Sequence, residues 1–210
     1  MLIVGASRGI GLELTRQYVA AGWETHATTR TPATPGPLGS MPVTLHELEV
    51  RDPSHLAAVV ADMSGAPIDV LLHVAGVYRG STNDMLEINA EAPIRVAEAL
   101  VENVALSNRR TIAILTSQLG ARRGRTGSLG GYGDSKAALN DAFRARAASW
   151  SDRGVGAVVI HPGWVRTDMG GRSAPLSAAE SARGIRALLA GLTPVMHGRF
   201  WTWDGREHPW

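Results

Sequence analysis

The stretch "MLIVGASRGIGLE", residues 1–13, decides the fold. Four apolar residues run into a turn that carries Gly5, Gly9 and Gly11, and a helical pattern follows. In a strand–turn–helix unit, such glycines allow the tight turn, the approach of a pyrophosphate to the backbone, and close helix–strand packing. The start of the helix faces the phosphates with free N–H groups and the positive end of its dipole. A plain strand–helix connection is the alternative, but the position of the glycines favours a nucleotide site.

Strand-like and helical segments alternate along the rest of the chain. Strands are predicted at 1–4, 24–29, 43–50, 69–74, 111–117, 156–161 and 199–203, and helices near 10–21, 54–63, 84–106, 133–150 and 177–191. This alternation predicts an α/β fold, a Rossmann-type doubly wound sheet of about seven mostly parallel strands in a three-layer sandwich. We expect residues 1–210 to form a single domain, in which the Pro/Gly-rich segment 31–42 is a surface connection.

The composition excludes several classes of function. With 44% hydrophobic and 19% charged residues, the chain has the make-up of an ordinary globular protein. It contains no cysteine and no histidine cluster at metal-ligand spacing, so we expect no metal. The net charge of +2 argues against nucleic acid, and no apolar run approaches the ~20 residues of a membrane span. The N-terminus lacks the basic region of a signal peptide, so the cytoplasm is the expected location.

The end of the second predicted strand indicates which dinucleotide is bound. An acidic residue at this point binds the ribose of NAD, whereas an arginine suits the 2′-phosphate of NADP. This chain has Thr28, Thr29 and Arg30 there, and Arg8 in the glycine turn adds a second positive charge. Two solvated surface arginines are the alternative, but their positions favour NADP(H).

The segment "GGYGDSK", residues 130–136, places Tyr132 one helical turn before Lys136. A tyrosine titrates near ~10 and needs help to act as an acid–base group at neutral pH. A lysine at the i+4 position shares its helix face and could supply that help. Taken alone, the same spacing also arises between two unrelated side chains on a helix.

Six motifs in order resemble the short-chain dehydrogenase/reductase family over the whole chain. They are "GASRGIG" (5–11), "HVAG" (73–76), "IN" (88–89), "TS" (116–117), "YGDSK" (132–136) and "HPGWVRTDMGG" (161–171). The resemblance is greatest to the short sniffer-like carbonyl reductase branch, which also contains proteins similar to C-factor. It implies NADP(H) as the cofactor and a small-molecule carbonyl compound as the substrate.

The resemblance also implies a catalytic set. Tyr132 matches the general acid that protonates the carbonyl oxygen, and Lys136 matches the residue that lowers the tyrosine pKa and binds the nicotinamide ribose. Ser117 matches the hydroxyl that polarises the carbonyl, although a strand-end serine can also simply cap a loop. Asn89 matches the residue that holds a water in the proton relay. Pro93, four residues later, has no N–H to give to the Asn89 carbonyl, which leaves that carbonyl for water or merely kinks the helix.

The implied cofactor contacts extend along the chain. By resemblance they are Gly5, Ser7, Arg8, Gly9, Ile10, Gly11, Arg30, Glu49, Val50, Ala75, Gly76, Tyr132, Lys136, Pro162, Gly163, Val165 and Thr167. The Pro-Gly pair can be only a turn, but its place after a parallel strand favours a ligand.

The chain departs from the family pattern at two of these motifs. His73 stands where an asparagine is usual, and we expect a buried, hydrogen-bonded histidine with no catalytic role. Glu49 stands where an aspartate usually touches adenine, so an adenine contact is expected with one extra methylene. Asp52 is a competing candidate, but its position predicts a cap for the next helix.

The regions that border the substrate carry further signals. Arg122, Arg123 and Arg125 precede Tyr132 and either attract an anionic substrate or form a solvated basic loop. The short segment after Thr167 predicts an open cleft, which Trp164 could line. The indoles near the C-terminal end, in "RFWTW" (199–203), are explained better by core or subunit packing than by ligand stacking.

Two functions remain at this point. The first is an NADPH-dependent reductase of a ketone or aldehyde, in which Tyr132 is the general acid. The second is a dinucleotide-binding signalling or sensor protein of the C-factor type. A nucleic-acid-binding module has little support because no basic face with interleaved aromatic residues is present. The resemblance further implies a homodimer or homotetramer.

Overall fold

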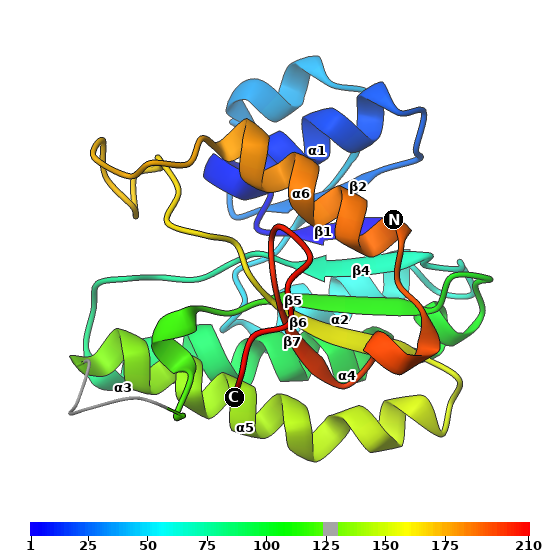
Figure 1. Cartoon of the computed structure of the whole chain (residues 1–210). Coiled ribbons are helices and arrows are strands. Elements are labelled where there is room, and N and C mark those ends of the chain that lie inside the picture. The colour runs from blue at the N-terminus through cyan, green and yellow to red at the C-terminus, as the bar shows by residue number, and fades with distance from the viewer. Residues whose placement is uncertain (124–129) are drawn as a thin grey trace.

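A computed structural model describes residues 1–123 and 130–210 and contains one seven-stranded sheet (Figure 1). The strands are β1 (Leu2–Val4), β2 (His26–Thr29), β3 (Thr44–Glu47), β4 (Val70–His73), β5 (Thr111–Leu115), β6 (Gly156–His161) and β7 (Arg199–Thr202). Their order in the sheet is β3-β2-β1-β4-β5-β6-β7, and every neighbouring pair is parallel. The predicted Rossmann-type sheet is confirmed, and all seven strands are parallel rather than most of them.

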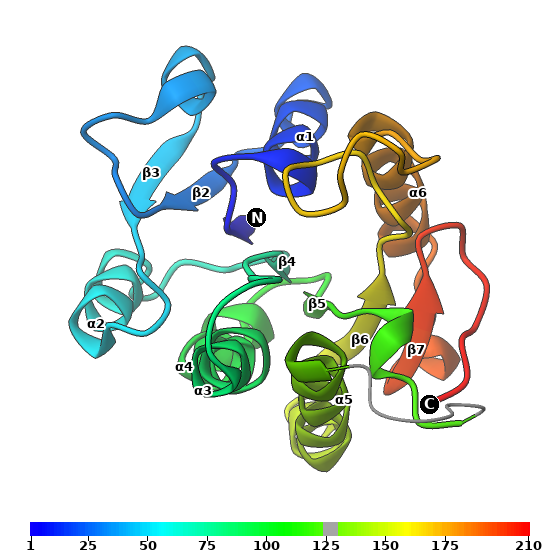
Figure 2. The ribbon, with the colours of Figure 1, turned by 90° about the vertical axis from the view of Figure 1, so that its left-hand side faces the viewer.

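Helices cover both faces of the sheet, as Figure 2 shows. Helices α1 (Gly9–Ala20) and α6 (Ala178–Ala190) lie on one face, and α2 (Pro53–Asp62), α4 (Ala92–Ala105) and α5 (Gly130–Ser151) lie on the other. Adjacent strand residues therefore enter different cores: Leu71 joins the α4–α5 side and Leu72 joins the α1–α6 side. This is the predicted three-layer sandwich.

The strand order reverses direction at β1. The chain runs outward from β1 to β2 and β3, then returns to place β4 on the other side of β1. In doubly wound sheets, loops part at such a switch point and leave a crevice at the carboxyl ends of the strands. The glycine turn after β1 and the "HVAG" segment after β4 both end there.

The predicted helix at 84–106 is interrupted. The structure has α3 (Thr82–Leu86), a π-helical turn (Glu87–Glu91) and then α4, and the N–H of Ala92 donates to the carbonyl of Glu87, five residues back. Pro93 follows at once, and a proline cannot donate the hydrogen bond of a regular helix. The predicted helical segment is confirmed over Thr82–Ala105, and it contains a π turn, which commonly marks a functional position, directly before this proline.

The segment 31–42 is more than a surface connection. It contains a 3₁₀ turn (Gly36–Ser40) whose Leu38 is fully buried in the core on the α1 side. Two further 3₁₀ turns lie at Gln118–Gly120 and Pro194–Met196. Asp52 caps α2 as predicted, since its side chain accepts a 2.8 Å hydrogen bond from the N–H of Ser54.

The end of the chain folds back along β7. The N–H of Thr202 donates to the carbonyl of Arg206, and the N–H of His208 donates to the carbonyl of Phe200. Trp201 and Trp203 pack against the core on the α6 side, as the packing interpretation predicted. In the part of the chain that the structure describes, no helix is both long and apolar enough to cross a membrane.

Candidate active site

Tyr132 and Ser117 meet at the carboxyl end of β5. Tyr132 lies in the first turn of α5, and Ser117 follows β5 and is buried. A side-chain hydrogen bond joins the two residues; burial raises the pKa of Tyr132, and this hydrogen bond partly opposes the rise. The Ser117 hydroxyl also accepts a 3.1 Å hydrogen bond from the N–H of Leu119. Ser117 therefore caps the turn that follows β5 and interacts with the tyrosine, and its role toward a substrate carbonyl stays a prediction.

Lys136 lies one turn further along α5 and is 5% exposed. Its ammonium donates a 3.0 Å hydrogen bond to the carbonyl of Leu115, and burial lowers its pKa to about 8. Gly120 permits this depth, because a Cβ there would stand 2.6 Å from the backbone carbon of Lys136. The ammonium is directed to the end of β5. Its effect on the pKa of Tyr132 stays a prediction.

Asn89 organises the other side of the cluster from the π turn. Its carboxamide oxygen accepts from the N–H of Val77 (2.8 Å), and its NH₂ donates to the carbonyl of Val77 (2.8 Å) and to the Ser135 hydroxyl (3.0 Å). The Ser135 hydroxyl in turn donates to the carbonyl of Tyr132. Both N–H groups of the amide are therefore used within the protein.

His73 requires a correction. It ends β4 and is 2% exposed, as expected, but neither ring nitrogen has a hydrogen-bond partner among the described residues. Burial, reinforced by the nearby Lys136 charge, lowers the pKa of His73 to about 3. The prediction of a hydrogen-bonded histidine was wrong, because the strand places the imidazole between apolar neighbours of both adjoining strands.

The glycine turn has the shape that a dinucleotide needs. Gly5 has φ +86°, and a Cβ there would stand 2.7 Å from the nitrogen of Ala75. A Cβ on Gly11 would meet the carbonyl of Gly5 at 2.1 Å, so these two glycines close the turn against the neighbouring backbone. The first turn of α1 contains no acidic residue, and Arg8 supplies no side-chain cap. The N–H groups there remain available to a phosphate, so the residues fit the predicted cofactor.

The two predicted phosphate-binding arginines both face carboxylates. Arg30 lies 3.8 Å from Glu49, and Arg8 lies 3.6 Å from Asp168 in the loop after β6. A cavity of about 420 Å³ opens beside Arg30, and Ser7 is also in its wall. The full lining is Ser7, Thr29, Arg30, Thr31, Thr34, Pro35, Gly36 and Pro37. Both arginines are therefore exposed and have loose carboxylate partners.

The remaining predicted cofactor contacts lie along the same edge. Pro162 accepts a 2.6 Å hydrogen bond from the Ser181 hydroxyl of α6, and Gly163 turns the chain with φ +88°. The Thr167 hydroxyl donates to the carbonyl of Val165, and its methyl group would lie 3.2 Å from a Cβ on Gly9. The others are placed as follows: Ala75 and Gly76 after β4, Ile10 in α1, and Val50 with its carbonyl bound by Arg95.

The mouth of the site exposes large apolar side chains. Tyr78 is 51%, Trp164 55% and Met169 44% exposed. The Tyr78 ring stands edge-on to Tyr132, with their centroids 5.0 Å apart. The indole N–H of Trp164 donates to the carbonyl of Gly170, which orients its ring.

The basic loop before α5 is only partly described. Arg122 is paired with Asp141 of α5, and Arg123 turns toward the C-terminal residues, where its N–H donates to the carbonyl of Trp210. Arg125 lies outside the described residues. The two described arginines are therefore engaged at the outer side of α5.

Sequence reasoning missed three residues of this site. Ser135 couples Asn89 to the Tyr132 backbone, Tyr78 borders the Tyr132 ring, and Asp168 pairs with Arg8. Ser135 lies inside the quoted "YGDSK" motif, so its place one turn from Tyr132 was a usable signal. Asp168 likewise lies inside the quoted "HPGWVRTDMGG" motif, whereas Tyr78 carries no such signal, because loop folding alone brings it to the site.

A doubly wound parallel sheet with this polar cluster beside its glycine turn defines a dinucleotide-binding protein of the Rossmann class. A model of the short chain dehydrogenase family matches residues 1–176. The chain belongs to the short-chain dehydrogenase family, as its motifs predicted.

Individual relatives agree with the predicted branch. C-signal of Myxococcus xanthus is 37% identical over 166 residues, which cover 74% of this chain and 100% of that protein. Carbonyl reductase Sniffer of D. melanogaster superposes with a TM-score of 0.92 at 28% identity, covering 100% of this chain and 98% of that one. A carbonyl reductase from Pseudomonas aeruginosa PAO1 in complex with NADP gives a TM-score of 0.84 at 32% identity, with the same coverage.

Proposed function

We propose that this oxidoreductase reduces a ketone or aldehyde to an alcohol with NADPH, and that Tyr132 is the general acid. The observation that carries the proposal is the hydrogen bond between Tyr132 and Ser117, with Lys136 buried one turn away. Two neighbouring hydroxyls can both donate to one substrate oxygen. The NADP-bound carbonyl reductase among the relatives supports the same chemistry.

The chain's own residues would hold the cofactor along the carboxyl edge of the sheet. The glycine turn and the free N–H groups of α1 would bind the pyrophosphate, and Arg8 and Arg30 would exchange their carboxylate partners for the 2′-phosphate. When bound, NADPH supplies the hydride that the carbonyl carbon receives. Lys136 would bind the nicotinamide ribose with the N–H groups that Leu115 does not use.

Proton transfer is assigned to three residues. Ser117 orients and polarises the carbonyl, Tyr132 gives its proton to the oxygen, and the nearby Lys136 ammonium stabilises the phenolate that results. The main-chain carbonyl of Asn89 would hold the water that returns the proton, because Pro93 has no N–H to offer it. Asn89 therefore contributes through its backbone, and its side chain positions the surrounding loops.

The test is oxidation of NADPH and NADH by the purified protein with a panel of ketones, diketones, quinones and aldehydes. We expect turnover with NADPH and a loss of about 10²–10⁴-fold in Tyr132→Phe, the usual contribution of general acid catalysis. Tyr78→Phe is the matched control, since it removes a neighbouring phenol hydroxyl outside the catalytic set. An unchanged rate in Tyr132→Phe would remove the general-acid assignment.

A signalling function is the second candidate, and the match to the full length of C-signal favours it. It predicts tight NADPH binding without turnover on any member of the panel. Tight binding with turnover that depends on Tyr132 would exclude a purely non-catalytic sensor.

We further propose a homodimer or homotetramer, as in the family that the sequence resembles. Light scattering on the purified protein at working concentration checks this. A monomer mass at all concentrations would contradict it.

A further inference from the structure

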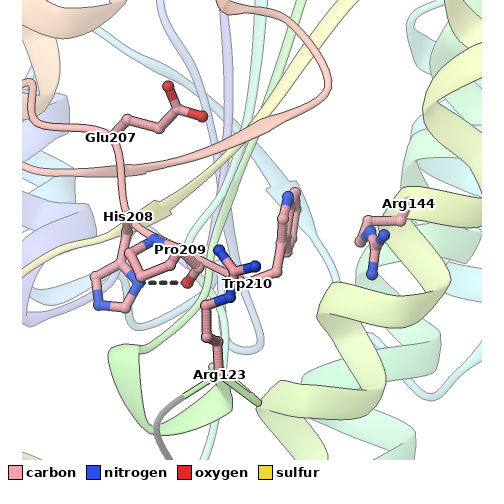
Figure 3. A pocket seen from close by; sticks show the side chains of 6 residues that line it. All are labelled: Arg123, Arg144, Glu207, His208, Pro209 and Trp210. Atoms are coloured by element: carbon pink, nitrogen blue, oxygen red, sulfur yellow. Dashed lines mark hydrogen bonds between the residues drawn. The ribbon is translucent and has the colours of Figure 1, made fainter.

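The arginines around the C-terminal residues already contact groups of the chain itself. A cavity of about 540 Å³ lies there, and Arg123, Arg144 and Trp210 are among its lining residues (Figure 3). The Arg144 guanidinium stands over the Trp210 ring, 5.3 Å from its centroid, and the N–H of Arg123 donates to the main-chain oxygen of Trp210. These arginines therefore differ from those beside the glycine turn, whose partners are loosely held carboxylates.

Four alternating charges lie in a row along the carboxyl edge of the sheet, and we call them the ion-pair series. Nη1 of Arg30 lies 3.8 Å from Oε2 of Glu49, and Nε of Arg51 lies 3.6 Å from Oε1 of the same carboxylate. Nη1 of Arg51 then lies 3.2 Å from Oδ1 of Asp84 in α3. The series therefore joins the segment after β2, which borders the 420 Å³ cavity, to the segment after β3 and to α3.

Arg51 holds both of its carboxylates at once, because it presents a different nitrogen to each of them. Its main-chain N–H also donates to Oε1 of Glu49 at 3.4 Å. Asp84 is fixed in turn by the Ser81 hydroxyl, which donates to its carboxylate at 2.7 Å. A planar guanidinium can make two such contacts in fixed directions, whereas an ammonium is a point charge. Arg51 is therefore positioned to stay beside Glu49 when Arg30 changes its partner.

Glu49 is the negative charge that opposes a 2′-phosphate at Arg30. Because Arg30 lies 3.8 Å from Glu49, an anion that Arg30 binds lies within about 10 Å of that carboxylate, which is the Debye length at ~0.1 M salt. The Glu49 side chain is only 27% exposed, so solvent screens its charge less than that of a free surface carboxylate. A cation that stays beside Glu49 offsets the repulsion. NADH lacks the 2′-phosphate and does not meet this repulsion.

We propose that Arg51 is a specificity-determining residue that favours NADPH over NADH without contacting either of them, because it neutralises Glu49 when Arg30 binds the 2′-phosphate. The proposal rests on the phosphate contact of Arg30 given under the proposed function. It goes beyond that contact, since Arg51 acts through Glu49 and Asp84 holds it in place.

The experiment is fluorescence titration of the purified protein with NADPH and with NADH at neutral pH and low ionic strength. We expect Arg51→Gln to bind NADPH about three- to fivefold more weakly than the wild type, at the upper end for exposed ion pairs, and to bind NADH unchanged. The loss should shrink at about 0.5 M salt, because salt screens the repulsion between Glu49 and the phosphate.

Two variants serve as controls for charge and for position. Arg51→Lys keeps the charge but loses the planar fork, so it should recover most of the NADPH affinity. Arg153→Gln removes a similarly exposed arginine that pairs with Glu102 near the opposite edge of the sheet, before β6, and should bind both dinucleotides as the wild type does.

A double-mutant cycle with Glu49 separates the proposed role from a direct contact between Arg51 and the phosphate. In the Glu49→Gln background, Arg51→Gln should leave the NADPH affinity nearly unchanged, because the carboxylate that Arg51 neutralises is absent. An undiminished loss in that background would overturn the proposal. Equal losses for NADPH and NADH in the single variant Arg51→Gln would also overturn it.

Arg30→Gln distinguishes a failure of this proposal from a failure of the phosphate contact on which it rests. We expect Arg30→Gln to weaken NADPH more than Arg51→Gln does and to leave NADH unchanged. If Arg30→Gln weakens NADPH but Arg51→Gln does not, the phosphate contact stands and the role of Arg51 is wrong. If Arg30→Gln leaves NADPH unchanged, both are wrong.

Discussion

The polar cluster around Tyr132 and the arginines near the glycine turn are held in place by different kinds of interaction. Asn89, Ser117 and Lys136 are buried, and their polar atoms have short hydrogen bonds to protein groups. Arg8 and Arg30 are mostly exposed and have only loose ion pairs, at 3.6 and 3.8 Å. Under the proposed function, the fold would preset the groups for proton transfer, whereas cofactor choice would depend on charges that can exchange partners.

The largest effect in the buried polar cluster is expected for Lys136→Met. We expect about a hundredfold loss of NADPH-dependent turnover together with a gain of up to about 3 kcal/mol in unfolding free energy. The gain follows because burial lowers the pKa from 10.5 to about 8 in the folded state, which makes the buried ammonium costly. Urea unfolding and steady-state kinetics measure the two effects.

The predicted cost of burying the Lys136 ammonium can be checked by measuring the unfolding free energy as a function of pH. Between about pH 8 and 10.5 the folded wild type has released the Lys136 proton while the unfolded chain still holds it, so stability should rise with pH across this window. The variant should lack that rise. A variant that is less stable than wild type at pH 7 would show that the hydrogen bond to Leu115 outweighs the cost of burial.

Asn89→Ala tests whether the hydrogen-bonded scaffold carries the site. The substitution leaves the backbone groups of Val77 and the Ser135 hydroxyl without their partner, and we expect about 3 kcal/mol of destabilisation. Asn83→Ala, in the exposed preceding helix, is the control and should cost far less. Equal losses in urea unfolding for both variants would contradict a positioning role for the side chain.

His73 is buried like the residues of this cluster but has no hydrogen-bond partner among the described residues. Low pH should therefore destabilise the folded protein through this residue. Its folded pKa of about 3 lies below the ordinary 6.5, so the unfolded chain takes up a proton that the folded chain refuses as pH falls. Between pH 7.5 and 5.5 this residue should cost about 1.4 kcal/mol of stability. Over the same pH interval, the unfolding free energy of His73→Asn, measured with urea, should fall by about 1.4 kcal/mol less than that of the wild type. If both proteins lost the same amount of unfolding free energy, His73 would have a hydrogen-bond partner in solution.

The smallest effect is expected on the exposed side, at Glu49. Glu49→Gln removes the carboxylate that competes for Arg30, so NADPH should bind about threefold more tightly, in line with the small worth of exposed ion pairs. NADH, which lacks the 2′-phosphate, should bind unchanged. Glu47→Gln, at the end of β3, is the control, and fluorescence titration gives the dissociation constants. A change of equal size for NADH would place Glu49 at the adenine instead.

The sequence was sufficient for the fold because its signals are local and repeated. Apolar strands alternate with helical segments, and the glycine turn marks the switch point beside β1. The π turn before Pro93 was not predictable. A hydrophobic pattern does not show whether a backbone N–H donates to the carbonyl four residues back, as in an α-helix, or five residues back, as in a π turn.

The candidate site was predictable where motif residues lie on strand ends and helix starts. Tyr132, Ser117 and Asn89 converge because parallel strands end at one edge. The carboxylate partners of Arg8 and Arg30 depend on how separate loops approach each other, which spacing along the chain does not encode. The unpartnered ring of His73 likewise reflects its neighbours on two other strands.

The C-terminal segment that returns along β7 also has a consequence for solubility. A strand at the border of a sheet offers unpaired N–H and C=O groups to any other chain, and this is a common route to aggregation. Here the Phe200 carbonyl accepts from the N–H of His208 and the Thr202 N–H donates to the carbonyl of Arg206, so these groups at the border are already paired. The returning C-terminal residues Arg206 and His208 therefore hinder the addition of another strand to β7.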